Sequence, residues 1–254
     1  MNTKVSRYIL DKELSASSME ERVAWFHRMQ KTQPVHYRPE YDMWEVFRYK
    51  DVLQVLLDHA TFSVDKCLPE TFPCALGKSD PPEHRQIRSL VSKAFSPHRI
   101  EEFKPLVGKI VDELLEQAKA SGKTNLVTEL AEPLPGRVIA KVLGLPAEDQ
   151  ERFQQWSNQL IGQMLGITNP DNSEIIQYFA DLLNERKRAP RADLMSAFLA
   201  AEENGTHLAR QKIIELCMEL MTAGHPTTVR LLTYALQRFA RQPEIYQALR
   251  NDPS

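Results

Sequence analysis

Hydrophobic positions recur every three to four residues through most of the chain, a spacing typical of helices with one buried face. The pattern predicts helices over residues 50–62, 97–119, 137–143, 147–165, 173–188, 191–203 and 208–241, and a shorter one before residue 33. Residues 35–49 depart from it, because aromatic and β-branched residues flank the segment RPEYD. We therefore expect a mainly α fold with a small N-terminal β-hairpin.

One segment has neither a helical nor a strand period. Residues 62–79 contain two prolines and a glycine, which predicts a loop. A loop of this length is more often functional than a plain connector. No repeat or flexible linker divides the rest of the sequence, so residues 1–254 are expected to form a single domain.

Composition narrows the class of protein. Hydrophobic residues make up 42% of the chain and charged residues 26%, as in soluble globular proteins. The net charge of −2 offers no bulk attraction to nucleic acid or to an acidic membrane, so we expect neither as a partner. The three cysteines, Cys67, Cys74 and Cys217, fit no disulfide framework or metal-ligand spacing and suit a reducing compartment. With no secretion signal visible, the expected location is the cytoplasm.

The first candidate site is the stretch SDPPEHRQIRSLVSKAFSP, residues 79–97. It has the features of a helix start: Asp80 is expected to cap the helix, a proline follows, and Glu83 lies three residues after the cap. His84 and Arg88 are four residues apart on one helix face, so together they offer donors suited to a carboxylate. A solvated basic helix face is the alternative interpretation.

The second candidate site lies inside the expected helix 208–241, which is apolar on nearly every face and is expected to be buried all round. Polar residues surround Pro226 at its middle. A proline inside a helix removes the N–H that would bond the carbonyl of Thr222, at a cost of about 3 kcal/mol. Two interpretations stay open. One is a kinked core helix with threonine hydroxyls bonded to preceding carbonyls, and the other is a ligand site approached closely at Gly224.

Together these stretches resemble the cytochrome P450 family in its soluble bacterial form. DPPEHRQIR is similar to the family's C-helix motif, and LMTAGHPTTVRLL is similar to its I-helix motif. The sequence from Val35 to Ser63 resembles the N-terminal hairpin and B helix, and RQPEIYQALRNDPS resembles the J helix. These motifs occur in the family's order over essentially the whole chain. The resemblance implies an incomplete P450 fold.

The resemblance also implies roles for individual residues. His84 and Arg88 would hold the propionates of haem b. The cofactor-binding residues implied are His84, Arg88, Ala223, Gly224 and Thr228. Thr227 would be the catalytic alcohol, while Phe72 and Leu76 would contact substrate. An electron donor of ferredoxin type, fed by NAD(P)H, would dock on the proximal surface, on or near which the resemblance places Arg85, Lys93 and Arg99. For Arg85 and Lys93 the favoured interpretation is that they are plain surface charges.

Two departures from the family pattern matter. The chain ends at Ser254, where the family's K helix would begin, so the cysteine loop that supplies the haem thiolate is missing. We therefore expect no ligand of the haem iron within residues 1–254. Pro226 stands where the family has an acid. Glu185 and Arg188 match the family's Glu-x-x-Arg by letter only and are expected on a charged helix face.

The activity implied is a monooxygenase that inserts one oxygen atom into a small organic substrate, with this chain a C-terminally truncated form. The alternative is a non-catalytic P450-like helper or partner protein that lacks the thiolate. We do not expect residues 1–254 alone to bind haem fully, because the iron's protein ligand is absent.

Overall fold

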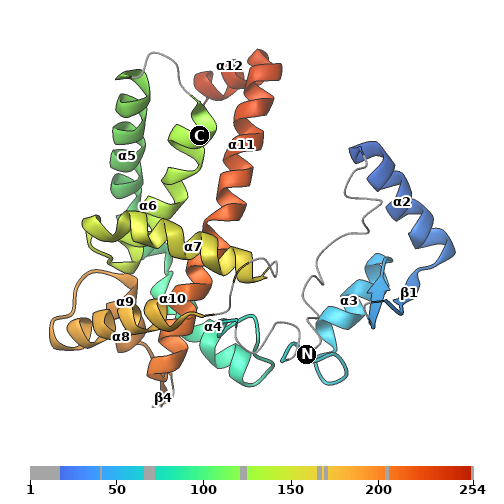
Figure 1. Cartoon of the computed structure of the whole chain (residues 1–254), viewed down its shortest axis with the longest axis horizontal. Coiled ribbons are helices and arrows are strands. Elements are labelled where there is room, and N and C mark those ends of the chain that lie inside the picture. The colour runs from blue at the N-terminus through green and yellow to red at the C-terminus, as the bar shows by residue number, and fades with distance from the viewer. Residues whose placement is uncertain are drawn as a thin grey trace.

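The computed structural model has a helical body and a smaller N-terminal part (Figure 1). It describes residues 18–40, 42–65, 72–120, 125–164, 168, 171–203 and 206–252. In the N-terminal part, α2 (Met19–Thr32) precedes an antiparallel hairpin of β1 (Val35–Arg38) and β2 (Met43–Val46), and α3 (Tyr49–Leu57) follows. The mainly α fold with its N-terminal hairpin is therefore confirmed.

Local interactions explain why these elements form. Ser18 and Glu21 exchange side-chain to backbone hydrogen bonds at the start of α2, which is a capping box. Trp25 of α2 packs edge-on against Phe47, with ring centroids 5.3 Å apart, and this contact joins the helix to the end of the hairpin.

The body consists of helices with one very short second hairpin. Its elements are α4 (Glu83–Ala94), α5 (Pro97–Ala120), the π-helical turn η1 (Val127–Ala131), α6 (Pro133–Leu143), the 3-10 turn η2 (Ala147–Asp149), α7 (Gln150–Met164), α8 (Ser173–Arg188), α9 (Leu194–Ala200), β3 (Glu202–Glu203), β4 (Thr206–His207), α10 (Arg210–Gly224), α11 (Pro226–Arg241) and α12 (Pro243–Asn251). The expected helix 191–203 is too long, because α9 ends at Ala200 and β3 begins two residues later.

The core lies where α10 packs against α6, α7, α8 and α9. Aromatic and aliphatic side chains from all five helices meet there with almost no solvent exposure. Each helix contributes at least one of them: Leu143, Phe153, Phe179, Phe198 and Met218. Burial of this apolar surface is the main force that holds the body together.

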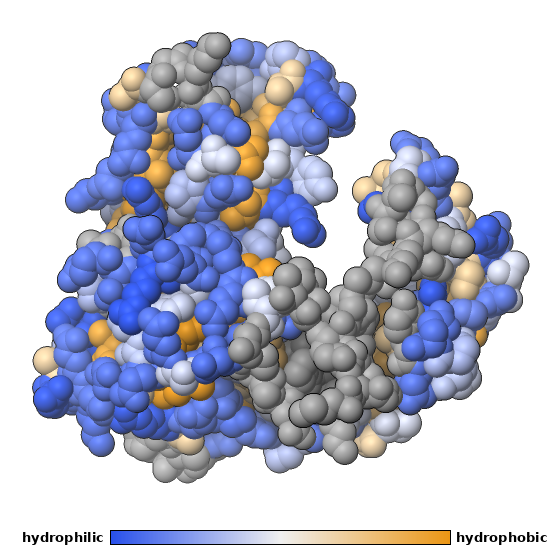
Figure 2. Space-filling view, viewed as in Figure 1, coloured by the Kyte–Doolittle hydropathy of each residue, from blue (hydrophilic) through white to orange (hydrophobic). Residues whose placement is uncertain are grey.

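The expected helix 208–241 is wrong in two respects. It is two helices, α10 and α11, with a break at His225. Only α10 is buried: it contributes six buried residues, whereas α11 has none among those the structure describes. Leu231 and Tyr234 on α11 are 68% and 60% exposed, and hydrophobic residues are visible on the surface of the body in Figure 2. None of the described helices combines the length and apolar character needed to cross a membrane.

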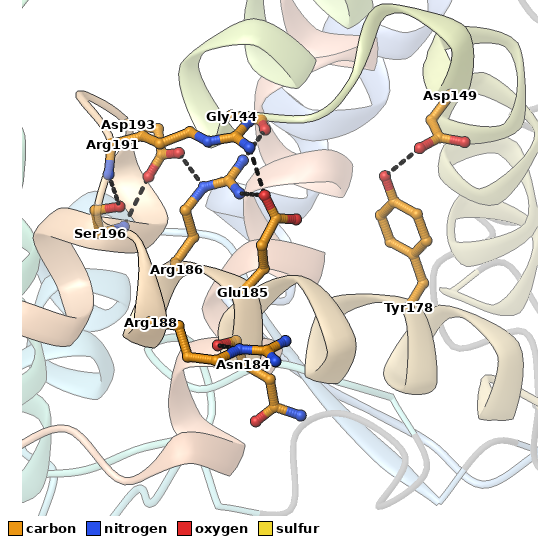
Figure 3. Close-up of polar contacts among 10 residues, drawn as sticks. All are labelled: Gly144, Asp149, Tyr178, Asn184, Glu185, Arg186, Arg188, Arg191, Asp193 and Ser196. Carbon is orange, nitrogen blue, oxygen red and sulfur yellow. Dashed lines mark hydrogen bonds and ion pairs between the residues drawn. The ribbon is translucent and has the colours of Figure 1, made fainter.

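A buried charge cluster joins α8, α9 and the end of α6 (Figure 3). Arg186 is 1% exposed, and its Nε lies 2.5 Å from the Asp193 carboxylate while Nη2 donates to the carbonyl of Gly144. Asp193 also caps α9 by accepting from the backbone N–H of Ser196 at 2.8 Å. The expected charged helix face around Glu185 and Arg188 therefore includes one arginine that points into the core.

Gly144 is required at the end of α6 for two reasons. Its φ of +88° is a left-handed conformation that side chains disfavour, as its expected role of helix stop predicts. In addition, a Cβ atom at this position would lie only 2.2 Å from an Asp193 carboxylate oxygen. The glycine thus allows the buried carboxylate to approach the backbone.

Candidate functional site

The loop that carries Phe72 and Leu76 is fastened to α10 by one carboxylate. Glu219 accepts three hydrogen bonds from consecutive backbone N–H groups: Ala75 at 3.1 Å, Leu76 at 2.9 Å and Gly77 at 3.0 Å. These partners are more than 140 residues apart in the chain. Hydrogen bonds to a charged acceptor are stronger than neutral ones, so this clamp fixes the loop against the helix.

The same loop is also hydrogen-bonded to α4. Nδ1 of His84 lies 3.2 Å from the carbonyl oxygen of Leu76, and the hydroxyl of Ser79 donates to that oxygen at 3.0 Å. An ion pair at 3.2 Å also links Lys212 of α10 to Glu83 at the start of α4. Loop, α4 and α10 are therefore one connected unit.

Arg88 lies one turn beyond His84 on α4. It is exposed and makes no hydrogen bond or ion pair with any residue that the structure describes, whereas Ile87 and Leu90 beside it are buried. The helix therefore buries its apolar side and leaves the guanidinium of Arg88 available for an anion.

Asp80 does not cap α4, contrary to expectation. The helix begins at Glu83, and its cap position is Pro82, with no side-chain cap bond. The Asp80 carboxylate instead accepts from the hydroxyl of Ser63 at 2.5 Å and from the backbone N–H of Val64. The Ser63 hydrogen bond holds the pKa of Asp80 below its usual range. The acid thus ties the N-terminal part to the start of α4.

At the junction of α10 and α11, the hydroxyls of both threonines of α11 donate to carbonyl groups at the end of α10. Thr227 donates to the carbonyl of Ala223 at 2.6 Å, and Thr228 donates to that of Gly224 at 2.9 Å. Thr227, Thr228 and Ala223 are exposed. The group that closely approaches Gly224 is Ile139 of α6, whose Cδ1 would lie 2.4 Å from a Cβ at that position.

His225 lies on the opposite side of this junction. It is 5% exposed, and its ring is held at both nitrogens: Nδ1 is 3.1 Å from the Ser157 hydroxyl and Nε2 is 3.1 Å from the carbonyl of Glu132. A cavity of about 750 Å³ opens beside it, between α7, α11 and the segment before α6. Pro226 and Arg230 line this cavity, whereas Thr227 does not.

The structure brings together part of the expected site. Phe72 and Leu76 lie in the loop, and Leu76 contacts both His84 and Glu219. Ala223 follows Glu219 by four residues, so both face the same side of α10. Thr227 bonds to Ala223 and continues this side onto α11.

Sequence reasoning missed Glu219 and the partners of His225. An acid within the otherwise apolar run LCMELM was the available signal for Glu219. Its partner atoms are backbone N–H groups, which leave no trace in residue types. No signal in the sequence pointed to Ser157.

Comparison with known proteins shows what the chain resembles. The family model described as Cytochrome P450 matches residues 138–253. The chain is 34% identical to the erythromycin C-12 hydroxylase of Saccharopolyspora erythraea, covering 90% of this chain and 60% of the relative. It is 32% identical to the mycinamicin IV hydroxylase/epoxidase of Micromonospora griseorubida, covering 90% of this chain and 61% of that protein.

The fold of this chain is also similar to solved structures of cytochromes P450. The structure of cytochrome P450 CYP109Q5 from Chondromyces apiculatus superposes with a TM-score of 0.80 at 31% identity, covering 95% of this chain and 63% of that one. The ligand-free cytochrome P450 TbtJ1 also gives a TM-score of 0.80, at 32% identity, with 92% and 63% covered. The chain thus spans about three-fifths of the length of the relatives it matches.

Proposed function

Because the chain belongs to the cytochrome P450 family, we propose that the full-length protein is a haem-dependent monooxygenase that inserts one oxygen atom into a small organic substrate. The observation that carries the proposal is the similarity of the sequence to a P450 hydroxylase over 90% of this chain, together with the similarity of the fold to a solved cytochrome P450 over 92% of it. Electrons would reach it from NAD(P)H through a donor protein of ferredoxin type.

The residues on α4 fit the carboxylates of a haem. Arg88 is exposed and has no partner among the described residues, and Nε2 of His84 has none either, because only Nδ1 is bonded to Leu76. Two donors one helical turn apart suit propionate groups. Ala223, Gly224 and Thr228 would contact the cofactor, which supplies the oxygen-activating chemistry when bound.

The described cysteines do not fit as ligands of the haem iron. Cys74 and Cys217 are buried, and burial raises the pKa of the Cys217 thiol, whereas an iron ligand must be a thiolate. Cys67 lies outside the described residues. We therefore propose that this chain contributes contacts to the haem propionates, and that neither of the two described cysteines supplies the thiolate.

Thr227 is the proposed catalytic alcohol. Its hydroxyl currently donates to Ala223 at 2.6 Å, so rotation about its side chain is needed before it can donate a proton elsewhere. Pro226 has no side-chain proton to relay. The neighbouring His225 is hydrogen-bonded to Ser157 and to the carbonyl of Glu132, so we do not propose it as the group that passes a proton to Thr227. The proton for Thr227 would then come from water or from the substrate. Phe72, with Leu76, would contact that substrate.

The proposal is tested on full-length protein by haem occupancy and by the reduced carbon-monoxide spectrum. We expect a thiolate-type spectrum, and lower haem occupancy in His84→Ala and Arg88→Ala, because each loses a charge-assisted bond worth about 1.5–3 kcal/mol. Arg85→Ala, an exposed neighbour on α4, is the matched control and should retain haem. A full-length protein without thiolate-bound haem would instead support the non-catalytic helper. Unchanged occupancy in both variants would leave His84 and Arg88 as an ordinary basic surface.

A further inference from the structure

We infer that Glu219 is a positioning residue for His84: it holds the loop at residues 75–77, and the loop in turn sets the orientation and tautomer of the His84 ring. The Glu219 carboxylate accepts three hydrogen bonds from consecutive backbone N–H groups of this loop. Those contacts stand without any assumption about activity. Only their consequence for a haem propionate rests on the proposed function.

The geometry of the clamp explains why a carboxylate is needed. One oxygen of Glu219 accepts from Ala75 and Leu76, and the other accepts from Gly77. A glutamine could reproduce the first pair of bonds through its single oxygen, but its amide nitrogen would face the N–H of Gly77. Only an ionised acid satisfies all three donors at once.

The clamp reaches His84 through a single residue. Leu76 gives its N–H to Glu219 and its carbonyl oxygen to Nδ1 of His84, at 2.9 and 3.2 Å. Peptide units are rigid and planar, so fixing the N–H groups of Leu76 and Gly77 also fixes the carbonyl between them. Glu219 therefore determines where this acceptor lies.

The chemical consequence concerns the His84 ring. Because a carbonyl can only accept, Nδ1 must carry the proton. In a neutral ring Nε2 then has no proton and can only accept a hydrogen bond. His84 can therefore donate from Nε2 to an anion such as a propionate only as the imidazolium. The loop contact makes anion binding by His84 conditional on protonation of the ring.

The experiment measures this chain directly, by NMR of residues 1–254 with labelled histidine at about pH 8, where an ordinary imidazole is neutral. In the wild type, ring nitrogen–proton correlations should show His84 with its proton on Nδ1, and His84→Gln identifies the signal. In Glu219→Leu the signal should move toward the Nε2-protonated form. Exchange of the amides of residues 75–77 should become about tenfold faster or more, since a charged acceptor is lost.

Two further variants separate positioning from general damage. Glu215→Leu removes the acid one turn earlier on α10, whose partners are Gln211 and Lys212, and should change neither measurement. Glu219→Gln should keep the slow exchange of Ala75 and Leu76 and lose that of Gly77. A general effect on folding would not spare two amides and expose the third. If Glu219→Leu does not fold, Glu219→Gln provides the test in its place.

Each outcome is decisive. Unchanged amides and an unchanged His84 signal in Glu219→Leu would overturn the inference, and so would faster exchange without a change at His84. If the clamp behaves as expected but His84→Ala retains haem in the full-length protein, the proposed propionate contact fails while the positioning role of Glu219 stands.

Discussion

Arg186 carries a positive charge into the core, where its partners are Asp193 and the carbonyl of Gly144. Removal of one member of a buried ion pair leaves the other charge uncompensated. We expect Arg186→Met to lower the free energy of unfolding by about 3–5 kcal/mol. Urea denaturation followed by circular dichroism measures the change.

The neighbouring Arg188 provides the control for this variant. It is exposed and its Nε donates to the carbonyl of Asn184 at 3.3 Å, so Arg188→Met should change stability by no more than about 0.5 kcal/mol. Equal midpoints for Arg186→Met and wild type would contradict the energetic importance of the buried pair.

Pro226 replaces an acidic side chain of the family motif with one that cannot deliver a proton. Pro226 offers no side-chain proton next to the proposed alcohol Thr227, and the imidazole of His225 is engaged by Ser157 and by the carbonyl of Glu132. We expect Pro226→Glu, in full-length protein, to raise the fraction of NADPH-derived electrons that appears in product. Product formed per reductant consumed is the measurement. Tight coupling in the wild type on a substrate without polar groups, with no gain in the variant, would show that this account is wrong.

At the scale of elements, the break between α10 and α11 changes the meaning of the proline. Pro226 is the first residue of α11, a position where a helix does not require the N–H and where the fixed φ of proline is favourable. The cost of about 3 kcal/mol for a proline in a helix interior therefore does not apply. The break is part of the fold around His225, rather than a penalty imposed on a continuous helix.

This interpretation predicts a small effect of removing the ring. Pro226→Ala should change the free energy of unfolding by less than about 1 kcal/mol, because the helix start no longer depends on proline alone. Chemical denaturation of residues 1–254 provides the value. An increase of about 3 kcal/mol in the free energy of unfolding would mean that the proline interrupts a helix that would otherwise be continuous.

At the scale of the whole molecule, several apolar side chains on α11 and α12 face solvent. Leu231 and Tyr234 of α11, with Tyr246 and Leu249 of α12, are between 48% and 68% exposed. Exposed apolar surface of this kind promotes association. We expect residues 1–254 to self-associate with rising concentration in sedimentation experiments.

Variants on α11 test the cause of that association. Leu231→Glu combined with Tyr234→Ser should shift the chain toward monomer, whereas Gln237→Glu, an exposed polar position on the same helix, should not. A wild-type chain that stays monomeric at all concentrations would show that these side chains do not drive contact between copies.

Much of the fold follows from local pattern. The hairpin at residues 35–46, helix α8 and the stop of α6 at Gly144 agree with expectation, because alternation, helical periodicity and glycine conformations act over a few residues. The motif around His84 and the stretch before Thr227 were likewise sufficient to identify the family.

What the tertiary structure alone decided involves partners far apart in the chain. Backbone atoms 142 to 144 residues away, which no residue type reveals, satisfy the Glu219 carboxylate. The Asp80 carboxylate accepts a hydrogen bond from Ser63 instead of capping α4, and the His225 ring is hydrogen-bonded to Ser157 of α7. The spacing of apolar residues indicates which face of a helix is buried. The direction of a polar side chain depends instead on which donors and acceptors the packed helices bring within about 3 Å.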